Sequence, residues 1–76
     1  MNPPERSFSE LLSAMRQQLA ISQEDLARQL GVSYATVNRW ENGHSKPSRL
    51  ARAQLDLFRE KMTAQGKLVL REEPKP

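Results

Sequence analysis

The chain has 76 residues, no cysteine and a formal net charge of +3, and this length corresponds to one small domain. A domain of this size buries only about 60% of the surface that its unfolded chain exposes. The lack of cysteine excludes a disulfide framework and a thiolate metal site. No apolar run approaches the roughly 18 residues of a membrane-spanning helix, and the first residues lack the apolar segment of a secretory signal. We therefore expect a cytoplasmic protein that does not associate with membranes.

In chain order, residues 1–6 contain two prolines and favour a disordered lead. The first helix is expected to begin after Ser7, because Ser7 and Glu10 match the capping box, in which each side chain bonds a free N–H group of the helix start. Apolar residues then recur at helical spacing. They are Phe8, Leu11, Leu12, Met15 and Leu19.

A short second helix is expected from Ser22 to Gly31. Ser22 is a candidate N-cap, and two carboxylates follow in the first turn, where they favour the positive end of the helix dipole. Glycine at position 31 tolerates the left-handed conformation in which many helices end. The inner face of this helix consists of Leu26, Ala27 and Leu30.

The third and fourth helices follow the same signals. Ser33 caps a helix from Tyr34 to about Asn42, which Gly43 ends and whose inward anchors are Val37 and Trp40. From Ser48 an uninterrupted helical pattern runs to about Gln65. Its apolar residues within one wide arc are Leu50, Ala51, Leu57, Phe58 and Met62.

After Gly66, the segment 67–71 could form either a short strand or an extended arm on the core, and the last residues favour disorder. The sequence therefore predicts an all-α domain over residues 7–66. It is a small bundle of four helices, the last one long, followed by a C-terminal arm or tail over residues 67–76.

Positive charge gathers on the later helices. Between Ser33 and Arg52 there are four cations and one carboxylate, whereas Met1 to Val32 carries three cations and four carboxylates. A basic segment fits a polyanionic partner, and a solvated charged face is the alternative.

One face of the third helix has the composition of a surface that reads DNA. At about 100° per residue, Asn38 lies near 40° and Arg39 near 140° from Tyr34, whereas Val37 and Trp40 fall on the opposite side. A small residue, Ala35, stands among side chains that donate or accept hydrogen bonds. Such a face suits a major groove about 12 Å wide.

A set of residues in and around this helix forms a spaced motif. They are Gln23, the small Ala27, Gly31 in the turn, Val37, the E-N-G of Glu41 to Gly43, and Lys46-Pro47. In these residues the chain resembles the helix-turn-helix of the phage-repressor family, the lambda-repressor-like or XRE type, and the likeness covers about Leu11 to Leu57.

The resemblance implies which residues meet DNA. The candidate phosphate contacts are Ser22, Gln23, Asn42 and Lys46, and the candidate base contacts are Ser33, Tyr34, Ala35, Asn38 and Arg39. A guanidinium can bond both N7 and O6 of guanine and discriminate by about 1–3 kcal/mol, which makes Arg39 the strongest candidate. The alternative for Arg39 is a solvent-facing arginine or a phosphate clamp.

The resemblance also implies a structural ion pair between Arg16 and Glu41. His44, the one histidine, lies on a polar connector. With no second histidine and no cysteine, we expect no metal site, no cofactor, no catalytic residue and no enzymatic activity.

The implied function is sequence-specific binding of double-stranded DNA by a transcriptional regulator. Proteins of this kind usually bind paired half-sites as homodimers, and Leu55, Leu68 and Leu70 are candidate dimer contacts. The unbroken fourth helix departs from the family, which usually adds a fifth. The alternative is a protein-interaction module of the same fold, such as an antitoxin or an adaptor.

Overall fold

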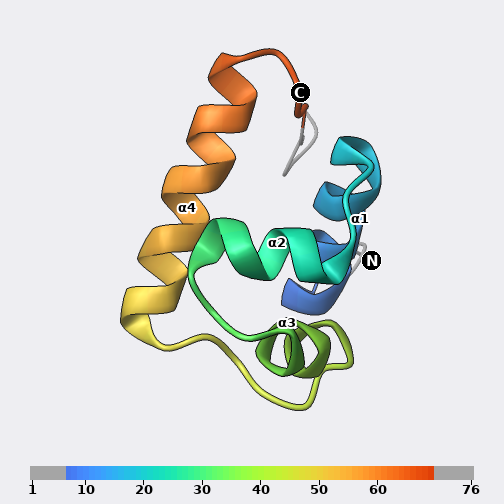
Figure 1. Cartoon of the computed structure of the whole chain (residues 1–76), viewed down its shortest axis with the longest axis vertical. Helices are drawn as coiled ribbons and strands as arrows, with labels where there is room; N and C mark the ends of the chain where they lie inside the picture. The colour runs from blue at the N-terminus through green and yellow to red at the C-terminus, as the bar shows by residue number, and fades with distance from the viewer. Residues whose placement is uncertain (1–6, 70–76) are drawn as a thin grey trace, which may run out of the picture.

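The computed structural model describes residues 7–69, which form four helices and no strand (Figure 1). The helices are α1 (Phe8–Leu19), α2 (Gln23–Leu30), α3 (Tyr34–Glu41) and α4 (Arg49–Ala64). The prediction of four helices with a long last one is confirmed. The expected disordered lead and the tail beyond residue 69 lie outside the described residues. Over the described range, no helix is long and apolar enough to cross a membrane.

A serine side chain caps the start of every helix. The hydroxyls of Ser7, Ser22, Ser33 and Ser48 each accept a hydrogen bond from the backbone N–H three residues later. In α1 and α2 the residue at that third position returns the bond, which completes two capping boxes. Since a serine cap contributes about 1 kcal/mol over alanine, these local signals explain why the helix starts were predictable.

Helices α2, α3 and α4 end near a glycine, whereas α1 does not. Gly31 adopts the left-handed conformation with φ of 74° at the end of α2, as expected. At the end of α1 the same conformation is taken by Ala20, with φ of 58°. A left-handed alanine costs about 1–2 kcal/mol. This turn could not be predicted, because no glycine marks it in the sequence.

The core lies where α1, α2 and α3 meet, with α4 packed against α2. The rings of Phe8 and Trp40 meet edge to face with centroids 6.0 Å apart, which joins the start of α1 to the end of α3. The buried residues are Leu12, Met15, Leu26, Ala27, Leu30, Val37, Trp40, Leu55, Phe58 and Leu68.

The inner face of α4 differs from the predicted arc. Leu50 and Leu57 belong to the predicted apolar arc, but they are 75% and 61% exposed and lie outside the core. The face that packs on the core instead repeats at intervals of four, three and four residues. It consists of Ala51, Leu55, Phe58 and Met62. The predicted arc covers more of the circumference of α4 than the packing against α2 can bury.

The segment after α4 returns to the core as an arm. Leu68 is 1% exposed, and the backbone N–H of Val69 donates to Oε1 of Gln18 on α1 at 2.9 Å. Residues 67–69 form neither a strand nor a helix. The prediction that Leu55 and Leu68 form dimer contacts is therefore wrong, because both are buried within their own domain. Leu70 lies outside the described residues.

Candidate nucleic-acid interface

The two sides of α3 differ sharply in exposure. Val37 and Trp40 are 0% and 3% exposed and anchor the helix, whereas Tyr34 is 52% exposed. Ala35, Arg39 and Asn42 are also exposed, and Asn38 is half-buried. The structure thus brings most of the candidate base-reading residues to one open side of an eight-residue helix.

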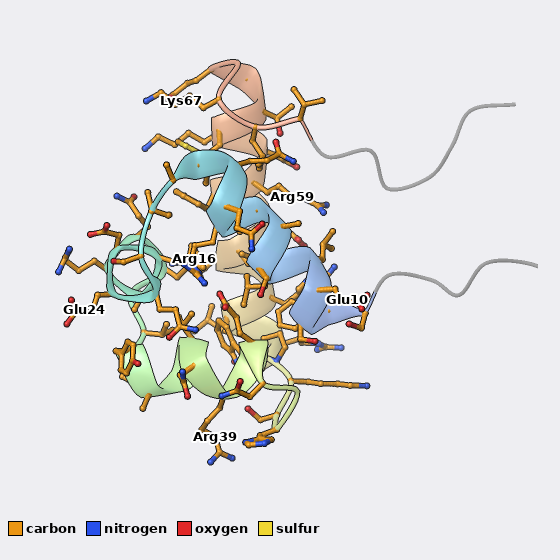
Figure 2. All side chains as sticks on the ribbon, turned by 90° about the vertical axis from the view of Figure 1, so that its right-hand side faces the viewer. Glu10, Arg16, Glu24, Arg39, Arg59 and Lys67 are labelled. Atoms are coloured by element: carbon orange, nitrogen blue, oxygen red, sulfur yellow. The ribbon has the colours of Figure 1, made fainter. Side chains whose placement is uncertain are left out.

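Arg39 extends away from the body of the protein beneath α3 (Figure 2). Within residues 7–69 the Arg39 side chain makes no hydrogen bond and no ion pair, and the same holds for the side chains of Lys46, in the connector after α3, and Arg49, at the start of α4. Uncompensated cations beside an open helix face provide a positive surface suited to phosphate and to base edges.

Two of the candidate hydroxyls are already used by the fold. Ser33 Oγ accepts from the N–H of Thr36 at 3.1 Å and shares a 2.9 Å hydrogen bond with Thr36 Oγ1. Ser22 Oγ accepts from the N–H of Asp25 at 3.0 Å. A DNA contact by either serine would have to coexist with its capping bond, so both remain predictions.

Arg16 of α1 and Glu41 at the end of α3 form an ion pair inside the domain. Arg16 Nε donates to Glu41 Oε2 at 2.7 Å and Nη2 donates to Oε1 at 3.0 Å, a bidentate geometry. The side chain of Glu41 is only 6% exposed. Arg16 Nη1 also donates to the backbone carbonyl of Ile21 at 3.1 Å, so the pair ties α1, the α1–α2 turn and α3 together.

The carboxylate of Glu41 is held in its ionised form. Burial alone would raise its pKa, but hydrogen bonds from Arg16 and Gln23, the charge of Arg16 and a hydrogen bond from Ser13 outweigh burial, and the net pKa lies below the ordinary value. Because the folded pKa is depressed, this stabilisation is present above the ordinary glutamate pKa and is lost as the pH falls through the lowered one.

Sequence reasoning missed a hydrogen-bonded connection between this ion pair and the outer face of α3. Gln23 Nε2 donates to Glu41 Oε1 at 3.0 Å, and Asn38 Nδ2 donates to Gln23 Oε1 at 3.1 Å. Gln23 was predicted to contact a phosphate. Its side chain is half-buried, and both the oxygen and the nitrogen of its amide form hydrogen bonds within the protein. The spacing of 15 residues between the two amides carries no local signal that could have revealed the contact.

The arrangement of α2, a glycine turn and an outward-facing α3 agrees with a comparison to known families. The helix-turn-helix family model matches residues 12–50, just over half of the chain. The chain belongs to this family. It is thus an XRE or lambda-repressor-like helix-turn-helix protein, a member of a DNA-binding family that is not typically enzymatic.

The matched region of this helix-turn-helix protein contains α2, α3 and the candidate contact residues. No curated protein matches the chain. Across residues 7–69, no group of three or more histidine, cysteine, aspartate or glutamate side chains is placed to hold a metal ion.

Proposed function

We propose that this helix-turn-helix protein binds double-stranded DNA in a sequence-specific manner and regulates transcription in the cytoplasm. The observation that carries the proposal is the unobstructed outer side of α3, with Tyr34, Ala35 and Arg39 exposed. In this arrangement α3 lies in the major groove. The N-terminus of α2 faces the backbone, where Gln23 and Ser22 meet phosphate, and Asn42 and Lys46 hold the other side.

Arg39 is the residue we expect to read guanine. Selection of bound sequences from random duplexes should yield a motif in which the Arg39→Ala variant loses its guanine preference at one base pair, because a bidentate contact discriminates by about 1–3 kcal/mol. The matched control is Arg28→Ala on α2, whose side chain is 71% exposed and paired with Asp25. An identical motif from Arg39→Ala and the wild type would remove Arg39 from the base-reading residues.

The dependence of binding on salt separates DNA recognition from a protein-interaction role. Each phosphate that the protein neutralises should lower the logarithm of the association constant by about 0.9 per tenfold rise in salt. An antitoxin or adaptor whose partner is a protein would instead depend on apolar contacts, and the truncation of Arg39 would leave partner binding largely unchanged.

We also propose that the protein binds DNA as a homodimer, because one eight-residue recognition helix reaches few base pairs and paired half-sites double that number. The exposed Leu50, Ala53 and Leu57 share one face of α4 and support a self-complementary contact. Light scattering should therefore report a dimer that Leu57→Glu weakens. A wild-type monomer at high micromolar concentration, together with a selected motif lacking twofold symmetry, would contradict the dimer.

A further inference from the structure

A chain of side-chain hydrogen bonds runs from the buried ion pair to the open side of α3. It begins at Glu41 Oε1, passes through the amide of Gln23 on α2, and reaches Asn38 on α3 over contacts of 3.0 and 3.1 Å. Asn42 Nδ2 closes the outer end by donating to Asn38 Oδ1 at 3.1 Å. Three amides thus stand in series behind one carboxylate.

The carboxylate fixes the direction of every bond in this chain. An ionised carboxylate only accepts hydrogen bonds, so Gln23 must turn its NH₂ group toward Glu41 and its oxygen away from it. That oxygen accepts in turn, so Asn38 must present its NH₂ group to Gln23. The amide of Asn38 is therefore held in one orientation, although an isolated asparagine could rotate its oxygen and nitrogen into either position.

The Asn38 amide is only partly used by its partners within the protein. An asparagine amide offers two N–H donors and two acceptor lone pairs. Gln23 uses one donor and Asn42 uses one lone pair. One donor and one acceptor remain on a residue that is half-exposed on the groove-facing side.

The donor and the acceptor that remain on Asn38 correspond to the groups that adenine presents. Adenine presents an acceptor at N7 and a donor at N6 in the major groove, which an amide with one donor and one acceptor satisfies together. Guanine presents two acceptors there, at N7 and O6, and the single remaining donor of Asn38 could satisfy only one of them.

We propose that Asn38 reads adenine and that Gln23 is a positioning residue, which transmits the fixed polarity of the buried Glu41 carboxylate to the Asn38 amide. This inference rests on the proposed DNA binding and adds the base read at one position. Gln23 acts through Asn38, so its loss should change the base preference at the base pair that Asn38 contacts.

The test is selection of bound sequences with the wild type, Asn38→Ala and Gln23→Met. Methionine has a length similar to glutamine but cannot form a hydrogen bond with Glu41 or with Asn38. The matched control is Gln29→Met, which replaces an exposed glutamine of the same helix. We expect Asn38→Ala and Gln23→Met to lose adenine preference at the same base pair, by about 5- to 150-fold, which corresponds to the 1–3 kcal/mol of a bidentate contact. Preferences at other positions and the Gln29→Met motif should be unchanged.

A second readout does not depend on DNA. In the free protein, Gln23→Met should shift the side-chain amide NMR signals of Asn38, whereas Gln29→Met should leave them in place, provided that both variants retain cooperative thermal unfolding. If the wild type selects a motif and Gln23→Met weakens all sequences equally, Gln23 is a phosphate contact only and the inference is overturned. If the wild type selects no motif, the proposed function itself fails. Independently of the DNA selection, Asn38 amide signals that do not shift in Gln23→Met would refute the hydrogen-bonded chain.

Discussion

Replacing Arg16 with methionine should lower the free energy of unfolding by about 3–5 kcal/mol, because it strands a charge inside the domain. The stranded group would be the Glu41 carboxylate, which is 6% exposed and receives two of its hydrogen bonds from Arg16. A small domain has a total stability of about 5–15 kcal/mol, so much of the protein should unfold at moderate urea. Chemical denaturation followed by circular dichroism measures the loss.

Two controls separate a stranded charge from a simple loss of contacts. Arg28→Met removes an arginine whose partner, Asp25, is well exposed, and should change stability little. The double variant Arg16→Met with Glu41→Leu removes both charges and should recover much of the loss, since an intact buried pair need not add net stability. Equal stability of Arg16→Met and the wild type at neutral pH would contradict the prediction.

Leu68→Ala should destabilise the protein by about 2–5 kcal/mol, the usual cost of truncating a buried leucine. Leu68 follows the last helix and lies beyond the family match, yet it is 1% exposed and belongs to the core. Val69→Ala is the matched control, because the side chain of Val69, next to Leu68 in the chain, is 64% exposed. Surface substitutions usually change stability by no more than about 0.5 kcal/mol.

Thermal or urea unfolding of the two variants measures this difference. If both variants lose the same small amount of stability, the C-terminal arm does not complete the core, and Leu68 would again be available as a surface contact. If Leu68→Ala alone is destabilised while remaining folded, the arm is an integral part of the domain.

The sequence predicted those parts of the fold that local chemistry determines. Helix starts at Ser7 and Ser22 were readable because a capping serine and an acidic residue three positions later act within one turn. The burial of Val37 and Trp40 followed from helical spacing. The turn between α2 and α3 followed from Gly31, which takes the left-handed conformation expected of it.

What the sequence could not give depends on how distant segments meet. The inner face of α4 was misjudged at Leu50 and Leu57 because its apolar residues surround much of the helix, and only the packing against α2 selects among them. Leu68 was placed among the dimer contacts because no local signal decided between a strand and an arm on the core for residues 67–71. The contact between Gln23 and Asn38 joins two helices and has no local signature.

The candidate DNA contacts were chosen from the resemblance and from one helical face, and their roles remain predictions. The structure adds a distinction among them that the sequence did not contain. The side chain of Arg39 has no hydrogen-bond or ion-pair partner within residues 7–69, whereas the side chains of Ser33 and Asn38 already form hydrogen bonds within the protein.

The separation of α3 into a buried and an open side has a consequence for redesign. Tyr34, Ala35 and Arg39 contribute nothing to the buried core, so a library that varies these three positions should retain the scaffold and, under the proposed function, yield variants that bind other DNA sequences. Asn38 does not belong in such a library by itself. Since its amide is coupled to Gln23, the two positions should be randomised as a unit.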